Sequence, residues 1–518
     1  MRKVLAGACA LAAVALGLTV AAPPGSGPDP AADALADGCE RNPTGLYTSE
    51  SPNWAYVGDR HAAASGPPPP ARWLRGLAHS QYRPWLATHP TEVDNPLTHR
   101  SYDFVLNVRP DPGYRLLLGG DSPGKTGNFQ GRSETTGRMH IEREAGAYPM
   151  WAWPEPGDRI ELRGSWVWDC DHFQGGGERT ELHPFRAIFV HRGARPGATS
   201  PRSPLGESEG DLFISTEKTP AGTQADCAHR TKGDRAAFRA CVSSDDDWQD
   251  VSGRYRFFLR APPKPAPRAR LTVRVVDRGS TRGAPLLRVQ KTERGVRIAL
   301  DLAVPRGRRV VIGKQFYVGW TPMPAGRLPV HLRLAFRTLR VRRAMDPSCA
   351  LSQPRCPARH QSTRLGQISR PPGEWTVYWD VAGIWGLWRP TILRARDGQV
   401  FRSKQTVDVY VARRSSWRLF LLARECDFGA LGSAGRPRLP VAPCPRSSEL
   451  GGSVGDDAPG AVVQPFRSPA SAVGEHRADS LLEGSSCPPT NRRGCYEVTY
   501  GVRVVNDAAR RAARPRRP

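Results

Sequence analysis

Alternation between apolar and polar residues dominates the chain and predicts β-strands. In Arg159–Asp169 every second residue is apolar or small, which is the period of a strand with one buried face. A second strand is expected at 180–191, and the glycine-rich turn at 174–177 would join the two strands into a long-looped hairpin. Residues 100–195 are therefore expected to form a β-barrel or β-sandwich domain, which contains the hairpin from Asp169 to His183.

Short strands punctuated by Pro, Gly and Asp continue through the rest of the chain, and no segment there keeps a helical period. This spacing is typical of antiparallel β-sandwiches and predicts one domain at 205–345 and another at 373–505. The pattern leaves open whether 205–505 forms two sandwiches or a single elaborated one. The predicted fold class is all-β, with tandem antiparallel β-barrel or β-sandwich domains joined by Pro/Gly-rich linkers.

Several stretches lack a clear strand pattern. Residues 23–70 are rich in Pro, Gly and Ala and are expected to be a disordered lead-in, and residues 428–486 to be a flexible insertion in the last domain. A short helix interrupted by prolines is expected between 71 and 99, and a strand at 114–118. Residues 506–518 form a basic tail.

The N-terminus has the features of a secretory signal peptide over residues 1–22. A short Met-Arg-Lys segment is followed by an uncharged apolar run, and Ala21 and Ala22 are small residues suited to cleavage. An uncleaved anchor is the alternative. No later stretch approaches the roughly 20 apolar residues that a membrane-spanning helix needs. The mature chain is expected to be secreted, extracellular or associated with the cell envelope.

The cysteine count supports export independently. The chain has 11 cysteines, and removal of the signal peptide would remove Cys9 and leave ten. An even number is expected of a fully oxidised secreted protein. Closeness in sequence suggests four local disulfides and leaves Cys39 for Cys170. The four local pairs are Cys227 with Cys241, Cys349 with Cys356, Cys426 with Cys444, and Cys487 with Cys495.

We therefore expect no free thiol in the mature folded protein. Thiol titration of denatured, non-reduced protein should detect less than one cysteine per chain, because every thiol would be consumed in a disulfide. A reduced sample is the control and should show all of them. Two or more free cysteines without reduction would refute full oxidation.

The net charge of +26 comes almost wholly from arginine, with 67 Arg against 8 Lys. A strongly basic exported surface attracts anionic polymers, so anionic envelope polymers or polysaccharides are the expected partners. Such attraction is non-specific and is screened by salt. The charge therefore indicates attraction to anionic polymers in general and does not identify one partner. No specific nucleic-acid recognition is expected.

Unlike polar groups are concentrated around the predicted hairpin. Glu181 and His183 should point to the same face, because side chains alternate along a strand. Asp169 ends the partner strand and His172 opens the loop, so all four side chains could converge. Two imidazoles and two carboxylates are an adequate set for zinc or manganese, and also for an acid–base pair. The alternative is structural, with the carboxylates bonding histidines and turn amides to fix the hairpin.

The two strands of the hairpin resemble a motif of uncharacterised secreted bacterial proteins, which usually reads Trp-Asp-Cys-Gly-His and then Thr-Glu-Ile-His-Pro. Here the segments are Trp-Asp-Cys-Asp-His at 168–172 and Thr-Glu-Leu-His-Pro at 180–184. Asp171 stands where glycine is usual and Leu182 where isoleucine is, and both changes leave the polar groups intact. The resemblance covers residues 100–430 and brings no known activity with it.

Two functions are compatible with these observations. The favoured one is a secreted or envelope-associated, non-catalytic binding protein of unknown ligand that needs no cofactor. The alternative is a metal-dependent hydrolase centred on the hairpin from Asp169 to His183, with one divalent metal such as zinc. The sequence has no His-Glu-x-x-His helix and no Cys-x-x-Cys pair, so no catalytic residue is assigned.

Overall fold

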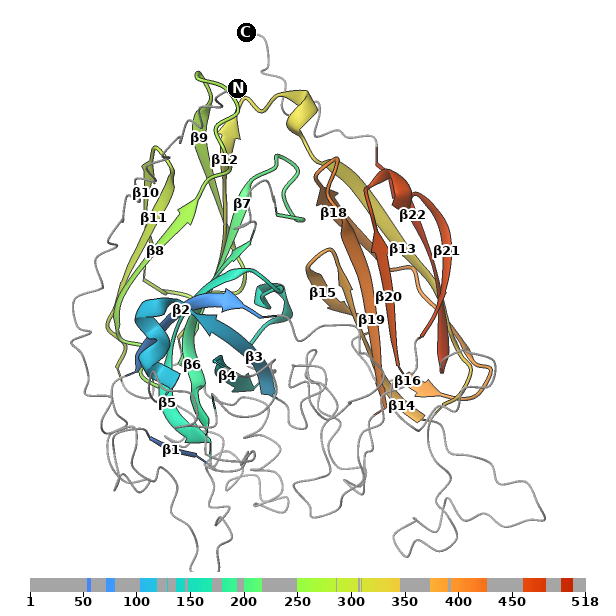
Figure 1. Cartoon of the computed structure of the whole chain (residues 1–518), viewed down its shortest axis with the longest axis horizontal. Helices are drawn as coiled ribbons and strands as arrows, with labels where there is room; N and C mark the ends of the chain where they lie inside the picture. The colour runs from blue at the N-terminus through green and yellow to red at the C-terminus, as the bar shows by residue number, and fades with distance from the viewer. Residues whose placement is uncertain are drawn as a thin grey trace, which may run out of the picture.

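A computed structural model gives the fold of the chain. It describes residues 54–56, 71–79, 103–118, 128, 137–144, 148–169, 179–192, 200–216, 249–285, 287–305, 308, 310–344, 373–389, 393–425, 460–480 and 495–505. Within these ranges the regular structure is β-strand with a few short 3-10 turns. The strands form two lobes, β1 to β12 in one and β13 to β22 in the other (Figure 1). The predicted all-β fold class with tandem antiparallel domains is confirmed.

The first lobe is built on a nine-stranded sheet in the order β1-β5-β2-β3-β4-β6-β7-β12-β9. Because β5 also pairs with β6, the strands β5, β2, β3, β4 and β6 close into a barrel. β4 and β6 run parallel, whereas β5 and β6 are antiparallel. The strands of this sheet are β1 (Trp54–Tyr56), β2 (Arg72–Ala78), β3 (Asp103–Pro110), β4 (Met139–Glu144), β5 (Arg159–Asp169), β6 (Arg179–Arg192), β7 (Ser208–Ser215), β9 (Arg270–Asp277) and β12 (Val311–Thr321).

The other end of this sheet packs on a three-stranded sheet in the order β10-β11-β8. These strands are β8 (Gly253–Arg260), β10 (Arg288–Thr292) and β11 (Gly295–Leu302). Alternate residues of β8, among them Tyr255 and Phe257, enter a core that β6, β7 and β12 also line. β6 belongs to both cores, because its Leu182 lies in the barrel core and its Phe189 in this sandwich core.

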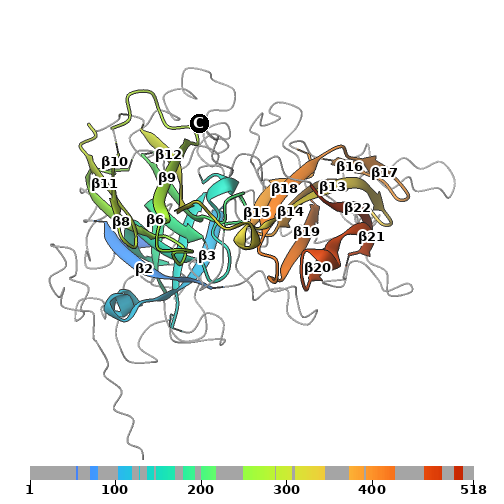
Figure 2. The same cartoon turned by 90° about the horizontal axis from the view of Figure 1, so that it is seen from above.

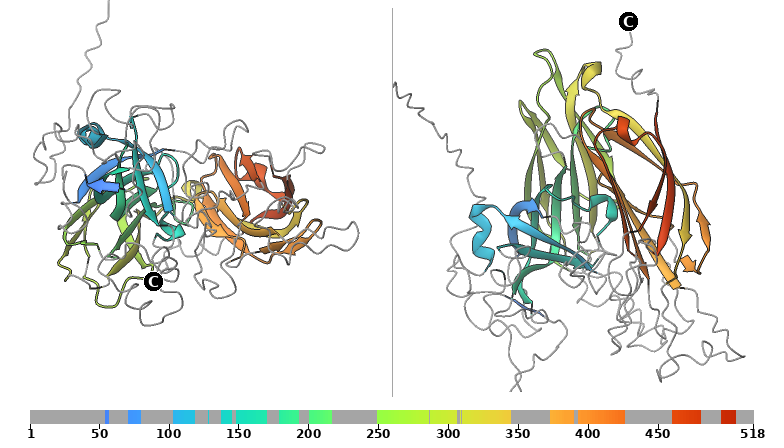
Figure 3. Two further views of the ribbon diagram at one scale, coloured as in Figure 1. Left: turned by 90° about the horizontal axis from the view of Figure 1, so that it is seen from below. Right: turned by 45° about the vertical axis from the view of Figure 1, so that its right-hand side comes forward.

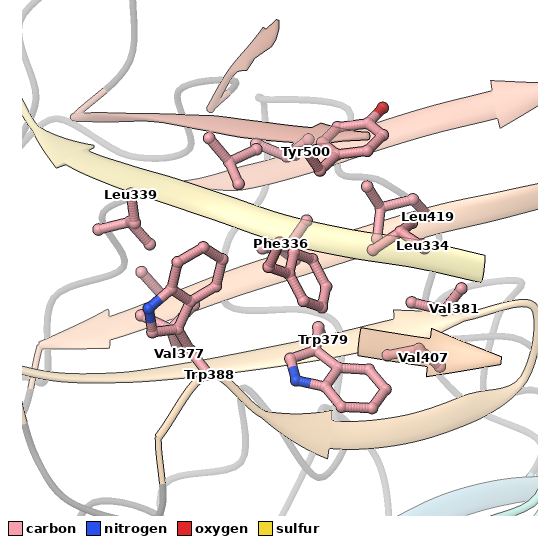
Figure 4. Close-up of a cluster of buried hydrophobic side chains, with 14 of the residues drawn as sticks. Leu334, Phe336, Leu339, Val377, Trp379, Val381, Trp388, Val407, Leu419 and Tyr500 are labelled. Atoms are coloured by element: carbon pink, nitrogen blue, oxygen red, sulfur yellow. The ribbon is translucent and has the colours of Figure 1, made fainter. Parts of the chain in front are cut away.

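The second lobe is a sandwich of two sheets, which Figures 2 and 3 show beside the first lobe. One sheet has the order β17-β13-β22-β21 with β18 also on β13, and the other β15-β14-β19-β20 with β16 also on β14. Phe336, Trp379, Trp388 and Tyr500 meet in the core between the sheets (Figure 4). The strands are β13 (Val330–Val341), β14 (Gly373–Val381), β15 (Ile384–Leu387), β16 (Leu393–Ala395), β17 (Val400–Arg402), β18 (Thr406–Val411), β19 (Trp417–Glu425), β20 (Ala461–Phe466), β21 (Gly474–Asp479) and β22 (Tyr496–Val504).

The strand pairing divides the chain differently from the domains expected at 100–195, 205–345 and 373–505. β6 and β7 lie on either side of the expected boundary near residue 200, yet they pair in one sheet. β13 falls in the expected middle domain but pairs with β18 and β22 of the last one. Alternation within a strand predicts the strand itself and not the sheet that it joins, which is why these partners differ.

Two local expectations were wrong. In the segment 71–99, where a helix was expected, Arg72–Ala78 form the strand β2, in which Leu74, Gly76 and Ala78 are buried at a period of two. The part of that segment after residue 79 lies outside the described residues. The strand expected at 114–118 belongs to the 3-10 helix Pro112–Leu118. β2 pairs with both β3 and β5, so these neighbours determine its conformation.

Strands also occur where disorder and a flexible insertion were expected. The lead-in at 23–70 contains β1, which pairs with β5. The segment at 428–486 contains β20, paired with β19, and β21, paired with β22. β20 and β21 are short and contain one aromatic residue between them, so their composition resembles that of a loop. Their backbone hydrogen bonds come from strands that are distant in sequence.

Most of the cysteines for which disulfides were predicted lie outside the described residues. Cys495 is buried in the core of the second lobe and forms a disulfide. The other cysteines lie outside the described residues, so the pairing scheme stays a prediction. In the part of the chain that the structure describes, no helix has the length and apolarity needed to cross a membrane.

Aromatic contacts and buried charges join the two lobes, and we call this region the interlobe joint. Trp153 of the first lobe lies 5.6 Å from Trp385 of the second, between ring centroids. Nε1 of Trp385 donates to Oε1 of Glu155 at 2.6 Å. Nη2 of Arg418, also in the second lobe, lies 3.3 Å from Oε2 of Glu155 and 3.5 Å from Oδ2 of Asp380.

Arg192 at the end of β6 is the central cation of the interlobe joint. Its Nε donates to Oδ2 of Asp211 at 2.6 Å, and its Nη1 donates to the carbonyl oxygen of Gly383 at 3.3 Å. Nη1 also lies 3.6 Å from Oδ2 of Asp158, and Nη2 donates to the carbonyl of Trp153. Arg192 therefore binds elements of both lobes through one buried guanidinium.

Candidate metal centre

The parallel pairing of β4 with β6 brings two polar pairs together. His140 lies opposite Glu181, and Ile141 opposite Leu182. Because side chains alternate along a strand, Met139 and Ile141 enter the barrel core, and His140 and Glu142 take the other face. The sequence of β4 thus places an imidazole and a carboxylate beside those of β6.

Four side chains meet at this face. His140, Glu142 and Glu181 each offer a ligand atom, and these atoms lie within 4.8 Å of one another. Nδ1 of His183 lies 3.5 Å from Oε2 of Glu142, and Nε2 of His140 lies 3.9 Å from the same oxygen. In a tetrahedral zinc site with bonds near 2.0 Å, ligand atoms are about 3.3 Å apart. Small side-chain adjustments would therefore bring these atoms onto one ion.

Asn107 of β3 orients His140. Nδ1 of His140 lies 3.0 Å from Oδ1 of Asn107, and both residues are buried. An amide oxygen only accepts hydrogen bonds, so in the neutral ring Nδ1 carries the proton and Nε2 carries the lone pair. Hydrogen bonds of this kind fix the tautomer and orientation of metal-binding histidines.

Burial makes the two carboxylates of the cluster costly when they are ionised. Glu142 is 6 % exposed and Glu181 is 3 % exposed. Ionised carboxylates removed from water need positive charge nearby. A divalent cation bound between the two carboxylates would stabilise both, and the two histidines would complete a four-ligand set.

Of the four predicted site residues, two lie at the cluster, one ends the strand β5, and one lies outside the described residues. Glu181 and His183 lie at the cluster, both near Glu142. Asp169 ends β5, where its backbone is opposite Arg179 of β6 and Trp54 of β1. His172 lies outside the described residues. The metal set of Asp169, His172, Glu181 and His183 therefore stays a prediction, and the described cluster has two of its members.

Sequence reasoning missed His140 and Glu142. Their signal was a His-x-Glu spacing in a short alternating segment, the mirror of Glu-x-His at Glu181 and His183. Both spacings put the two groups on one face of a strand. The parallel pairing that joins the two spacings has no sequence signature, so only the structure could reveal the cluster.

A second buried histidine–glutamate pair in the barrel provides a contrast. Nε2 of His191 lies 2.9 Å from Oε1 of Glu161, and Nε of Arg75 lies 2.7 Å from the other oxygen. Burial alone would raise the pKa of Glu161, but the hydrogen bond with His191 and the charge of Arg75 hold that pKa below its ordinary value. Arg75 and His191 thus stabilise the ionised form of this carboxylate without a metal ion.

Comparisons with known proteins identify no family. No protein-family model matches the chain, and no curated protein matches it. A C2 domain protein from Ramazzottius varieornatus is similar at 9% identity over 36% of this chain and 95% of that one, with a TM-score of 0.19. A structure of Extended-Synaptotagmin 2 with its SMP domain and two C2 domains is similar at 8% identity over 78% and 84%, again with a TM-score of 0.19. At these TM-scores, neither similarity identifies a family or an activity for this chain.

Proposed function

We propose that this chain is an exported, non-catalytic binding protein whose barrel holds one divalent transition-metal ion, with zinc as the first choice. The observation that carries the metal assignment is the convergence of His140, Glu142 and Glu181 within 4.8 Å, with His183 beside Glu142. The signal-peptide features support export, and so does the even number of cysteines, ten, that would remain after removal of the signal peptide. The basic surface supports attraction to anionic envelope polymers or polysaccharides.

Each ligand has a definite atom in this proposal. Nε2 of His140, Nδ1 of His183 and one oxygen each from Glu142 and Glu181 would bind the ion. Four protein ligands make a closed site, and closed tetrahedral zinc sites are structural, whereas catalytic ones keep one position for water. The ion would link β4 to β6, and its binding free energy would add to the stability of the barrel.

The test is metal content together with thermal stability. Untagged, purified protein should contain about one equivalent of zinc. Chelation should lower the melting temperature, because an ion at a hundred times its dissociation constant stabilises the folded state by about 2.7 kcal/mol. Glu181→Gln and His183→Ala should lose the metal, and their melting temperatures should not respond to the chelator.

The matched control is His191→Ala, which removes the other buried histidine–glutamate contact of the same barrel. This variant should be less stable but keep its metal and its response to chelation. A wild-type protein that contains no metal, takes up none from zinc-containing buffer and melts at the same temperature with chelator would end the proposal. Chelator-sensitive hydrolysis of model esters would instead favour the metal-dependent hydrolase.

A further inference from the structure

The outer face of the sheet formed by β8, β10 and β11 is strongly basic. One side of this sheet enters the sandwich core, so alternate residues point outward. The register groups the outward residues into rows across the three strands. We call this surface the basic face, and its outward side chains are Arg254, Arg256, Phe258, Arg260, Arg288, Gln290, Thr292, Arg297, Ala299 and Asp301, with Gly295 at the remaining position.

Arginine is concentrated on this face beyond the average of the chain. Five of the eleven outward positions are arginine, whereas the whole chain has 75 Lys and Arg in 518 residues. Only one outward residue is acidic, so the face carries five positive charges against one negative. The chain as a whole is basic, but this face is about three times richer in basic residues than the chain average, and that enrichment favours a specific surface.

Three of these arginines have no acidic partner among the described residues. Asp301 is paired with both Arg256, at 2.8 Å, and Arg288. Arg254, Arg260 and Arg297 are exposed and form no ion pair with another described residue. Their charges are therefore available to a ligand. A carboxylate or sulfate of that ligand would pair with these arginines, as Asp301 pairs with Arg256 and Arg288.

Phe258 lies among these charges. It is opposite Arg297 on β11 and between Arg256 and Arg260 along β8, and it is 38% exposed. Tyr255, Phe257 and Leu259 of the same strand are buried in the core, whereas Phe258 is on the opposite face and is not part of that core. An exposed ring beside cations offers an apolar surface on which the C–H face of a sugar ring can pack.

The spacing of the face suits a linear polymer. Alternate residues of a strand are about 6.8 Å apart, and neighbouring strands are about 4.8 Å apart, so the arginines form a regular array. A polymer with one charge on each sugar could meet several of them in succession. Single-stranded nucleic acid needs aromatic platforms for successive bases, and Phe258 is the only aromatic among the described residues of this face.

We propose that the basic face is the docking surface for a linear acidic polysaccharide. Arg254, Arg260 and Arg297 bind its carboxylates or sulfates, and Phe258 packs on a sugar ring. The inference rests on the proposed role of the chain as an exported binding protein, but not on its metal ion. The surface lies on β8, β10 and β11, whereas the metal ligands lie on β4 and β6.

The test compares two triple variants of the full-length protein with equal net charge. One carries Arg254→Gln, Arg260→Gln and Arg297→Gln on the basic face. The control carries Arg396→Gln, Arg413→Gln and Arg414→Gln, three exposed arginines of the second lobe. Binding to polygalacturonate is measured at several salt concentrations. The face variant should lose about tenfold or more in affinity and show a shallower salt dependence, and the control less than about threefold.

Phe258→Ala tests the sugar contact. It should weaken binding to polygalacturonate severalfold without changing the salt dependence, because it removes no charge. A single-stranded oligonucleotide of similar charge should bind more weakly than polygalacturonate. Tighter binding of the oligonucleotide through the same arginines would overturn the polysaccharide assignment, and equal losses in the two triple variants would overturn the surface itself.

Each titration is repeated with chelator, which separates this inference from the metal proposal. Unchanged affinity after metal removal is expected. If the chelator alone abolished binding while the two triple variants behaved alike, the metal centre and not the basic face would be the docking site. Deleting the basic tail at 506–518 should change the affinity of the wild type and of the face variant by the same factor.

Discussion

Replacing Arg192 with methionine is expected to destabilise the protein by about 3–5 kcal/mol, because it leaves a buried carboxylate without its cation. The change removes the 2.6 Å bond to Asp211, which is fully buried, and the bond to the carbonyl of Gly383. Methionine fills a similar volume, so the loss reports on charge and hydrogen bonding. Urea denaturation of wild type and variant measures the change.

Arg333→Met is the matched control for this prediction. Arg333 also bonds one carboxylate, with its Nε 2.8 Å from Oδ1 of Asp408, but both partners are partly exposed. Water can solvate Asp408 when the guanidinium is removed, so a much smaller loss is expected. The double variant Arg192→Met with Asp211→Asn should recover part of the stability, since no buried charge is left unpaired. Equal losses at Arg192 and Arg333 would contradict the role assigned to the interlobe joint.

The stability of the protein is expected to fall as the pH rises from about 5 to about 8. Carboxyls outnumber guanidiniums in the interlobe joint and the first-lobe charges next to it. Asp158 and Asp211 lie beside Arg192, and Glu209 beside Arg202. Glu155 and Asp380 face Arg418. Burial raises the pKa of Asp158 to about 7, and burial together with a neighbouring carboxylate raises the pKa values of Glu209 and Asp380 to about 8.

The sign follows from proton binding in the two states. In the unfolded chain these carboxyls have pKa values near 4 and are ionised above about pH 5. The folded protein keeps their protons up to about pH 7 or 8, so each carboxyl lowers stability by about 1.4 kcal/mol per pH unit in that window. Below pH 4 both states are protonated and the contribution is constant. Burial alone would raise the pKa of Asp211, but Arg192 and Arg202 hold it low, so Asp211 affects stability only at more acidic pH.

Denaturation midpoints at about pH 5.5 and pH 8.5, in chelator and at constant ionic strength, test this prediction. Asp380→Asn should weaken the pH dependence and be more stable than wild type at the higher pH, because its amide oxygen can still accept the bond from the amide of Gly383. Asp408→Asn is the control, since the pKa of Asp408 is lowered and the group is ionised throughout. A wild type that is equally or more stable at the higher pH would refute the prediction.

Regular alternation made some elements predictable from the sequence. β5 has the bounds expected from the pattern, because it has one apolar face that repeats over many residues. β4 was not recognised, since Arg143 occupies a core position where an apolar residue is expected. Arg143 is fully buried, bonds the carbonyl of Phe185 and lies over the rings of Phe185, at 5.6 Å, and Phe213, at 5.5 Å.

Only two of the four residues of the candidate site could be predicted from the sequence, for a related reason. Glu181 and His183 are two positions apart on one strand, so local geometry was enough to place them on the same face. His140 comes from a strand about 40 residues earlier, and its approach depends on the closure of the barrel. Pairings between distant strands depend on the packing of the whole lobe, which a local pattern does not encode.

The central position of β22 has a consequence for how the second lobe folds. β22 pairs with β13 on one side and β21 on the other, and Thr338 meets Thr499 across 161 residues of chain. Contacts this distant in sequence slow folding, because the loop must close before the pairing stabilises anything. While the chain emerges from N- to C-terminus, one edge of β13 has no partner until β22 arrives. During that interval the unpaired edge can pair with a strand of another chain, so we expect the second lobe to be prone to aggregation until β22 is in place.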